Sequence, residues 1–408
     1  MAARAPGYGL RDVILTHAEE DPEGTWEEPV ADYGTVLYAA DHRSEWESFK
    51  NQPLNPSLTP RQTTLGGLNH RITWESELGG RAGAAPAVLA TGVPQWAKSA
   101  AGMQSEQGKS WDLTTDTGTP IPGERFLEAT GAHGFYFFKI IGTPGNADQV
   151  IGVEIGTVAI STAYTGEKSG ATFTTSDTLN AANYCVIHRP ISQYDSRSYG
   201  LCFKEPGTVS TYIRVAVAGA RGTWGIRAAR GQTIRLLCEV LGAFNAAESS
   251  SNVTITDAEI IGDPYTQLGF IGDAIFTAFG VDAAYTQLSN FELALGNPLA
   301  MRESANVAAG VIGVRHGPGG REPTGSIDPE MAANVTDTET WSAFVGTEGI
   351  LAVNLGSVAG NIAEIRVGRA LFTGYSGGDR GPIKVLALPF DVAGAGTAKD
   401  YEIMIATR

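Results

Sequence analysis

The chain has 408 residues, of which 42% are hydrophobic and only 18% charged, with 51 glycines and 20 prolines. Glycine and proline together exceed their average usage of about 12%, which favours many short strands and tight turns over long helices. The net charge of −15 argues against a nucleic-acid-binding protein, because neutralising phosphates requires clustered lysine and arginine. No run approaches the roughly 18 apolar residues of a membrane span, and the first residues lack a signal-peptide core. We therefore expect a soluble protein that matures in a cytoplasm.

The first 60 residues are acidic and irregular. They hold eleven acidic side chains against four basic ones, and prolines interrupt short apolar runs such as Val13–Leu15. This pattern predicts an N-terminal arm over residues 1–60 that is ordered by contact with another surface. Trp26, Trp46 and Phe49 lie in this polar segment, and aromatic side chains there suggest anchors into a neighbouring subunit.

After the arm, apolar and polar residues begin to alternate regularly. Ile72, Trp74 and Leu78 alternate with polar residues, which predicts a half-buried strand. A short helix is expected over residues 86–91, because Pro86 can open it and Gly92 can close it. Residues 101–190 then combine a polar stretch with the apolar runs 135–141 and 150–160, so we predict an inserted small β module that projects outward.

The segment from Thr223 to Val240 has the pattern of a β-hairpin. Two alternating apolar faces flank the turn 229–232, where Gly231 can adopt the positive φ of a short loop. The faces consist of Trp224, Ile226 and Ala228 on one strand and Ile234, Leu236, Cys238 and Val240 on the other. The outer face carries the candidate inter-subunit residues Arg221, Arg227, Arg230 and Arg235. We expect these arginines to bind acidic residues of the arm.

The rest of the chain completes a β domain that we assign to residues 61–100 and 191–408. A strand is expected over 253–261, followed by a moderately helical or mixed stretch to residue 299 and a long glycine-rich loop at 315–325. Strands over 383–390 and 401–405 close the chain.

The residues that could carry chemistry are dispersed. No two of the six histidines lie within five residues of each other, so the signal for a metal site is weak. His17 stands close to Glu19–Asp21, but the alternating ligands and central glycine of a calcium loop are missing, which favours a solvated acidic loop. We favour buried free thiols for Cys185, Cys202 and Cys238 over a disulfide or a metal site.

Four short patterns imitate active-site motifs. Gly374–Gly378 matches the Gly-x-Ser-x-Gly spacing that would make Ser376 a nucleophile, but no histidine follows it in the chain as the motif requires. Glu75 and Glu77 imitate a glycosidase pair, yet they share the expected solvent face of a strand. Neither Gly317–Gly325 nor Gly108–Ser110 forms a complete phosphate-binding loop. We therefore expect no catalytic residue, no cofactor and no metal, and a protein that is not an enzyme.

The order of segments resembles the tail tube proteins of long-tailed bacteriophages. The likeness is carried by residues 65–80 with 85–92, by the central hairpin, and by residues 362–405. In the hairpin it includes Gly-Ala-Arg-Gly-Thr-Trp at 219–224 and Ala-Arg-Gly-Gln-Thr-Ile-Arg-Leu at 229–236. The stretch from 101 to about 190 is longer than in simple tube subunits.

The resemblance implies a mainly β fold, a tail-tube-type β-sandwich or barrel with a short helix. Such subunits form rings, commonly homohexamers, that stack around a tape-measure protein between the tail terminator and the distal tail or baseplate proteins. Genomic DNA passes through the lumen without specific binding. The protein would lie in the virion after assembly in the bacterial host cytoplasm. A pseudo-hexameric trimer is the alternative, and hexamers are favoured because no internal duplication is visible.

Elementary physics supports this reading. A tube of one protein covers the open sheet edges of each subunit by pairing them with a neighbour, and an acidic wall repels the sliding DNA weakly. We expect the arm and the 315–325 loop to reach into adjacent subunits or rings. The rival functions are another virion structural protein, a receptor- or glycan-binding β protein of the distal tail, and a β-rich hydrolase.

Overall fold

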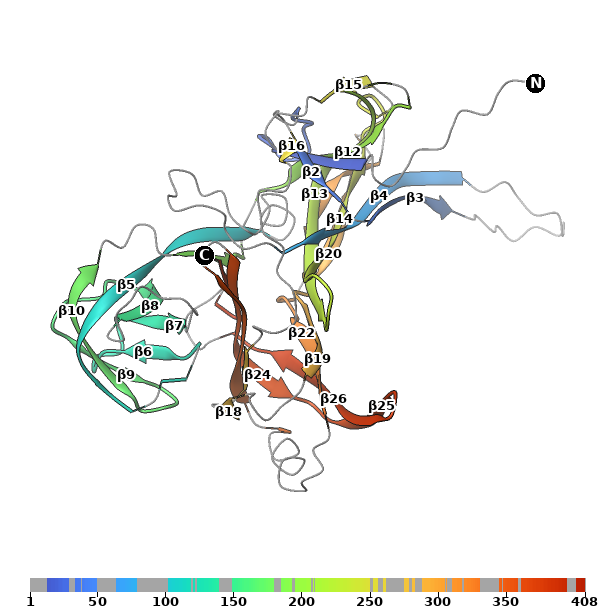
Figure 1. The fold of residues 1–408 in the computed structure, drawn as a ribbon. Helices are drawn as coiled ribbons and strands as arrows, with labels where there is room; N and C mark the ends of the chain where they lie inside the picture. The colour runs from blue at the N-terminus through green and yellow to red at the C-terminus, as the bar shows by residue number, and fades with distance from the viewer. Residues whose placement is uncertain are drawn as a thin grey trace, which may run out of the picture.

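The computed structural model describes residues 13–28, 34–37, 39–49, 64–78, 102–118, 120–121, 123–138, 149–179, 185–192, 195–206, 208, 210–249, 252–255, 260–261, 275–278, 281–282, 288–304, 306, 310–317, 319–330, 345–346, 348–358, 361–394 and 401–407. These residues form strands and turns and no helix (Figure 1). Nearly all strand pairs are antiparallel, and the pair of β16 (Ile260–Ile261) and β2 (Gly34–Val36) is parallel. The expectation of a mainly β protein is confirmed.

One run of neighbouring strands crosses the body from one projecting hairpin to another (Figure 1). Its order is β3, β4, β14, β13, β19, β22, β26 and β25, each hydrogen-bonded to the next. We call this run the main sheet. The bounds are β3 (Ala39–Phe49), β4 (Thr64–Glu77), β13 (Thr211–Ala229), β14 (Arg235–Phe244), β19 (Leu288–Ala294), β22 (Thr324–Pro329), β25 (Ser376–Arg380) and β26 (Ile383–Val392).

A second run packs against the main sheet and closes the core of the body. It follows the order β17, β23, β24, β27, β11 and β5, and β24 also pairs with β26. The bounds are β5 (Met103–Thr117), β11 (Cys185–Pro190), β17 (Ile275–Ala278), β23 (Glu348–Val358), β24 (Asn361–Phe372) and β27 (Ile403–Thr407). One hydrophobic cluster includes residues of both runs, such as Trp224 and Ile365.

The N-terminal segment differs from the predicted arm. Strand β1 (Val13–Glu19) is buried over its first six residues and lies between β12 (Arg197–Lys204) and β2 (Gly34–Val36). The prediction of an irregular arm is therefore wrong for this strand, because the Val13–Leu15 run finds its partner strand far along the chain. The same applies to β3, which pairs with β4 along its length.

Six described strands between Met103 and Leu179 form a closed sheet of their own. Each of the six strands pairs with two neighbours in the cyclic order β5, β8, β7, β6, β9, β10 and back to β5. The bounds are β6 (Arg125–Leu127), β7 (Gly134–Phe138), β8 (Gln149–Ile155), β9 (Ala163–Gly166) and β10 (Thr172–Leu179). We call this unit the closed module. Its interior is aromatic and includes Trp111, Phe126, Phe135 and Phe173.

The module shares β5 and β11 with the body. The first half of β5 pairs with β11, and β11 pairs with β27 of the body. A small buried cluster joins Tyr136 and Phe138 of the module to Ile187 and Met404 of the body. The inserted β module expected over 101–190 therefore includes a strand, β11, that belongs to both units.

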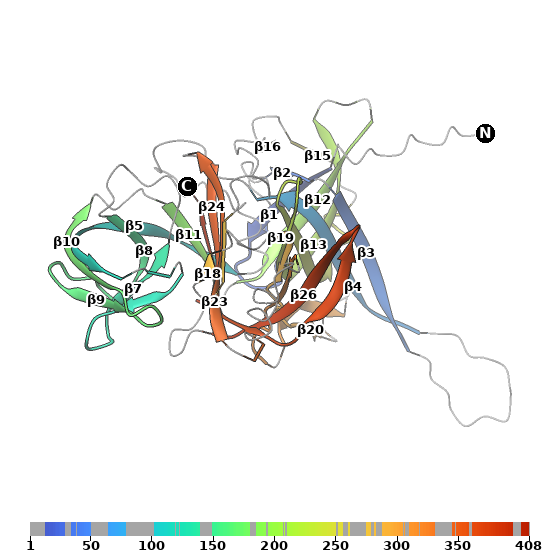
Figure 2. The same ribbon diagram turned by 60° about the horizontal axis from the view of Figure 1, so that its bottom comes forward.

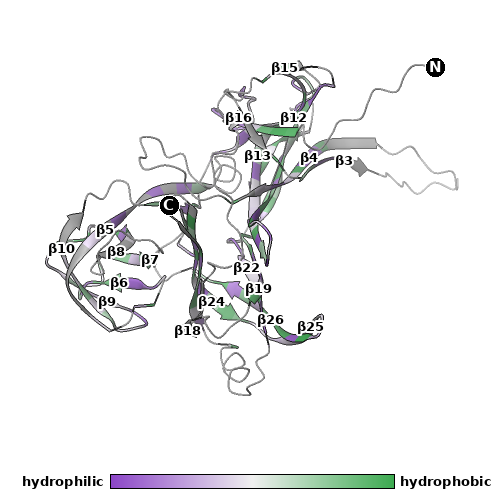
Figure 3. Ribbon diagram, viewed as in Figure 1, coloured by the Kyte–Doolittle hydropathy of each residue, from purple (hydrophilic) through white to green (hydrophobic). Residues whose placement is uncertain are grey.

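The predicted central hairpin is confirmed. Trp224 faces Cys238 and Ile226 faces Leu236 across β13 and β14, and all seven predicted inward side chains are buried. Gly231 has a φ of 74° in the turn. The predicted alternation on β4 is confirmed too, with Trp74 and Leu78 buried. Buried and more exposed residues alternate along much of β13 and β26. Figure 3 shows that the strands of the body carry both hydrophilic and hydrophobic residues.

Other predicted elements have mixed outcomes. The three cysteines are buried free thiols, as predicted. The stretch before residue 299, expected to be helical or mixed, is described where it forms β17, β18 (Val281–Asp282) and β19. The helix expected over 86–91 lies outside the described residues. No helix among the residues with described structure is long and apolar enough to cross a membrane.

Candidate assembly surface

The titratable groups that could support chemistry are buried and separated. Burial and the nearby Arg197 lower the pKa of His17 to about 3, and burial raises the pKa of Cys202 to about 11. Over the described ranges, no group of three or more His, Cys, Asp or Glu side chains could hold a metal ion. Ser376 begins a strand that turns into another strand, so it lacks the strand-to-helix geometry of a nucleophile elbow.

The main sheet ends in two strands that each have one described partner. Strand β3 pairs with β4 alone, and β25 pairs with β26 alone, among the pairings within the described residues. Both hairpins project from the body in Figure 1, and the β3–β4 hairpin projects in Figure 2 as well. An open strand edge presents unpaired backbone N–H and C=O groups that can pair with another chain. The two edges are therefore the leading candidates for contact with a second copy.

The β3 edge is charged and exposed. Residues 41–45, which include Asp41, Arg43 and Glu45, are all exposed, and Arg43 pairs with Glu45 at 3.0 Å. Trp46 and Phe49 stand in this strand opposite Leu68 and Thr64, and their side chains lie outside the described part. The backbone of Trp46 and Phe49 therefore lies in the edge strand β3 rather than in an irregular arm.

The β25 edge combines apolar and charged side chains. Tyr375 precedes the strand with 58% of its surface exposed, and Ile383 follows the turn with 40% exposed. Asp379 forms an ion pair with Lys384 across the hairpin. Gly377 has no atom near the position of an added Cβ. The sheet face at Gly377 is therefore open, and the outer edge of β25 has no partner among the described strands.

The outer face of the main sheet carries cross-strand ion pairs. Arg235 of β14 binds Glu75 of β4 at 2.6 Å, and Arg227 of β13 binds Glu292 of β19 at 3.1 Å. Both arginines were candidates for inter-subunit contacts. They lie on the predicted face, but each already has a carboxylate partner in its own chain.

Arg221 is likewise engaged within the chain. It donates to the carbonyl of Val314 at 3.0 Å and lies 3.4 Å from the carboxylate of Glu23, which also faces Arg302 at 3.4 Å. Of the four predicted arginines, Arg221 thus pairs with an acidic residue of the first 60 residues, but inside one subunit rather than between subunits. Arg230 is exposed in the β13–β14 turn, and its backbone N–H donates to Ser289.

Trp26 covers a buried guanidinium. The Arg214 guanidinium carbon lies 4.7 Å from the centroid of the Trp26 ring, and Arg214 pairs with Glu28 and Glu248. The indole N–H of Trp26 donates to Glu28. This predicted anchor therefore packs against its own subunit.

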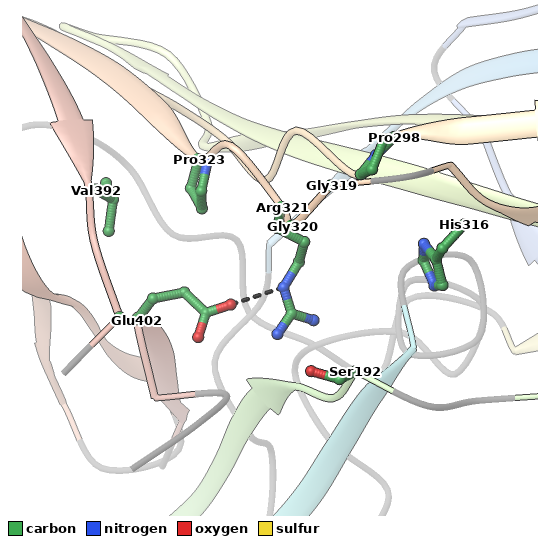
Figure 4. A pocket seen from close by; sticks show the side chains of 10 residues that line it. Ser192, Pro298, His316, Gly319, Gly320, Arg321, Pro323, Val392 and Glu402 are labelled. Carbon is green, nitrogen blue, oxygen red and sulfur yellow. Dashed lines mark ion pairs between the residues drawn. The ribbon is translucent and has the colours of Figure 1, made fainter. Parts of the chain in front are cut away.

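The 315–325 loop is fixed at its C-terminal half. Arg321 binds Glu402 at 2.7 Å and donates to the carbonyl of Ile191 at 2.9 Å. Figure 4 shows the Arg321 guanidinium pointing into a cavity of about 310 Å³, with His316 on the other side. The ion pair between Arg321 and the buried Glu402 therefore holds the C-terminal half of the loop to its own chain, and the contact of this loop with adjacent subunits stays a prediction.

Sequence reasoning missed the residue that fixes the segment after β1. Glu20 is buried and accepts four hydrogen bonds, from the hydroxyls of Ser196 and Ser198 and from the backbone N–H groups of Gly219 and Gly24, at 2.6–2.8 Å. Its place in an acidic run suggested a solvated loop. The groups that donate hydrogen bonds to Glu20 become apparent only from the pairing of β1 with β12, and no local sequence pattern indicates this pairing.

Comparison with protein-family models and with curated protein sequences finds no match to this chain.

Proposed function

We propose that the protein is a structural virion protein that assembles into stacked rings and forms the hollow tail tube of a bacteriophage. The observation that carries the proposal is the main sheet, an antiparallel run of eight strands with an open edge on a projecting hairpin at each end. The sequence resemblance to tail tube proteins supports the same function independently.

Two different open edges on one subunit favour a ring. When β3 of one copy pairs with β25 of the next, the contact is heterologous, and repeated heterologous contacts close into a ring when the rotation per subunit divides a full turn. Each pairing would cover two edges that otherwise invite uncontrolled aggregation. We favour homohexameric rings.

The closed module fits the outside of such a ring. Its six described strands all have two neighbours, so they offer no edge for ring closure, unlike β3 and β25. A bulky unit in the lumen would block DNA. The partners of the ring are then its own copies, the tape-measure protein, the tail terminator and distal tail or baseplate proteins. The net charge of −15 is compatible with DNA sliding through without being bound.

Electron microscopy of the purified protein tests this function, with one variant that blocks an edge. Gly377→Pro removes a backbone N–H from β25 and places a ring where a partner strand would pair. We expect stacked rings or tubes from the wild type and only dispersed particles from the proline variant.

Gly377→Ala is the matched control, because it keeps the N–H group and its Cβ meets no atom. It should assemble like the wild type. Dispersed wild-type particles under all assembly conditions would contradict the tube, and tubes from Gly377→Pro would exclude β25 as the contact.

The second candidate is a receptor- or glycan-binding β protein of the virion, which the exposed ring of Tyr375 favours, since exposed aromatic rings can stack on sugars. It predicts discrete particles that bind glycans in the same preparation. Tyr375→Ala would then abolish glycan binding without changing particle size.

A further inference from the structure

The junction between the closed module and the body contains a charged cavity of about 370 Å³. Strands β6 and β7 and the β9–β10 turn line it from the module, and β23 and β24 line it from the body. The module lies beside β23 and β24 in Figure 2. None of the contacts proposed for tube assembly uses this cavity.

The cavity wall has more cationic than anionic groups. Its lining includes four cationic side chains and two carboxylates. The cationic ones are Arg125, Lys168, Arg366 and Arg369, and the carboxylates are Glu167 and Glu348.

Two ion pairs on opposite sides of the cavity account for both carboxylates. Glu167 receives two hydrogen bonds from Arg125 on the module side, and Glu348 receives three from Arg369 on the body side. Among the lining side chains, the positive charges of Arg366 and Lys168 therefore remain. Two further buried carboxylates lie outside the lining, Glu364 on β24 and Glu124, which accepts from the backbone N–H of Lys168.

Arg366 is the buried member of the group, with 1% of its surface exposed. Its Nε donates to the carbonyl of Gly123, its Nη1 lies 3.4 Å from the carbonyl oxygen of Tyr401, and its guanidinium carbon lies 4.3 Å from the centroid of the Tyr136 ring. All three contacts are with neutral groups. Among the described residues, the carboxylates that act on Arg366 electrostatically are Glu364 and Glu167, and no ion pair joins either of them to it.

A buried guanidinium without a carboxylate partner is costly, because the desolvation of an ion amounts to several kcal/mol and arginine stays protonated in proteins. Burial accordingly lowers the pKa of Arg366 to about 10. An anion in the cavity would supply the missing charge, and a guanidinium matches the oxygens of a phosphate or carboxylate group in geometry.

We propose that this cavity binds a small oxyanion between Arg366, Lys168 and Arg369. The anion joins the module to β24 of the body, and it stabilises the folded chain by mass action because the unfolded chain lacks the site. The inference is independent of the tube, since its test reads binding and stability rather than assembly.

The test compares the thermal unfolding of the full chain in sodium phosphate, sulfate, acetate and chloride at equal ionic strength and pH. We expect phosphate or sulfate to raise the midpoint by at least about 2 °C at saturation, relative to chloride. A rise with acetate alone would identify a carboxylate as the bound group. Equilibrium dialysis with labelled phosphate, sulfate or acetate then measures the dissociation constant directly.

Variants separate specific binding from general salt effects. The double variant Lys168→Ala with Arg369→Gln changes partly exposed side chains and should weaken anion binding at least tenfold, whereas Arg366→Met should abolish it. Arg227→Gln, which breaks an exposed ion pair on the main sheet, is the control and should respond like the wild type. Equal midpoints in all four salts, or equal binding by the wild type and the double variant, would overturn the proposal.

Discussion

Glu20 connects three parts of the chain through one carboxylate. Its oxygens join the end of β1 to two serines at the start of β12 and to the backbone of β13. Hydrogen bonds to a charged group contribute about 1.5–3 kcal/mol each when a partner is deleted, and buried donors left unpaired cost more than exposed ones. The stability of the junction between β1, β12 and β13 therefore depends on the buried Glu20, although the preceding residue, Glu19, is exposed.

Glu20→Gln should lower the free energy of unfolding by about 2–4 kcal/mol, because the amide nitrogen cannot accept the bonds that one carboxylate oxygen accepts. Glu19→Gln, which breaks only the exposed pair with Arg197, should cost less than about 1 kcal/mol. Urea denaturation of both variants measures the difference. Equal losses would show that the Glu20 bonds contribute nothing beyond a surface ion pair.

The buried His17 predicts a loss of stability in acid. Its pKa is lowered to about 3 in the folded chain and is about 6.5 in the unfolded chain, so between these values the unfolded state binds more protons and stability falls as the pH falls. The loss between pH 7 and pH 5 should be about 2 kcal/mol for this group.

His17→Gln removes the titrating group. At pH 8, where histidine is neutral in the folded and the unfolded chain, the difference in unfolding free energy between the wild type and this variant measures the packing cost of the substitution alone. The stability difference between the wild type and this variant should therefore shrink as the pH falls from 8 to 5, which denaturation at each pH measures. A constant difference would contradict a neutral buried His17.

Individual side chains could be predicted from sequence where a local pattern determines them. The alternation at Trp224, Ile226 and Ala228 predicts burial correctly, because a strand places every second residue on one face. The partners of Arg221 and Arg302 could not be predicted, since both meet Glu23 from strands about 200 or more positions away.

Strand β13 illustrates how a single element organises its neighbours. Its first half pairs with β12 and its second half with β19, while β14 follows the other edge. The pairing register shifts between Ala218 and Arg221, where Gly219 has a φ of 59°. An added Cβ at Gly219 would lie 2.6 Å from Gly313 and Ile312. This glycine lets the hairpin of β20 (Leu299–Glu303) and β21 (Val311–His316) pack against β13.

Gly219→Ala should therefore destabilise the protein by about 3 kcal/mol, since backbone strain and close contact with main-chain atoms add. Gly231→Ala is the matched control, because it has a similar φ of 74° but no atom near the added Cβ. It should cost only about 1 kcal/mol. Thermal or urea unfolding distinguishes the two, and equal effects would show that strain alone matters.

The existence of strands could be predicted better than their partners. The hairpin turn, β4 and the closing strands follow from alternation and glycine placement. The short Val13–Leu15 run looked irregular because its pairing with β12 spans more than 180 positions. A different reason hid β3, whose partner β4 is near in the chain: its exposed charged residues give it no alternating apolar face.

On the scale of the whole molecule, the module and the body share buried side chains. Tyr136 and Phe138 of β7 pack with Ile187, Met404 and Ala406. Separating the two units would expose this cluster, so neither unit is expected to unfold alone.

We therefore predict one cooperative unfolding transition for the described strands of module and body. Native-state hydrogen exchange should show the same opening free energy for the slowest amides of β7 and of β27, because both open only in global unfolding. An opening of β7 that is several kcal/mol easier than that of β27 would contradict the shared core.

The sequence indicates an insertion and a β domain, but not how they join. Composition and turn spacing suffice for the mainly β class. The closure of the module depends on the pairing of β5 with β10, whose partner residues lie 55 to 69 positions apart. The cavity beside Arg366 depends on contacts between segments more than 200 positions apart, and local patterns encode neither.

The three buried cysteines have a practical consequence for labelling. Cys185, Cys202 and Cys238 are the only cysteines of the chain, and each is a buried thiol. Thiol reagents should therefore modify the folded wild type slowly, so a cysteine placed at exposed Gly131 or Gly381 would be the one fast-reacting position. Fluorophores attached at these turns could report the number of copies in an assembly and the distances between them without removal of any native residue.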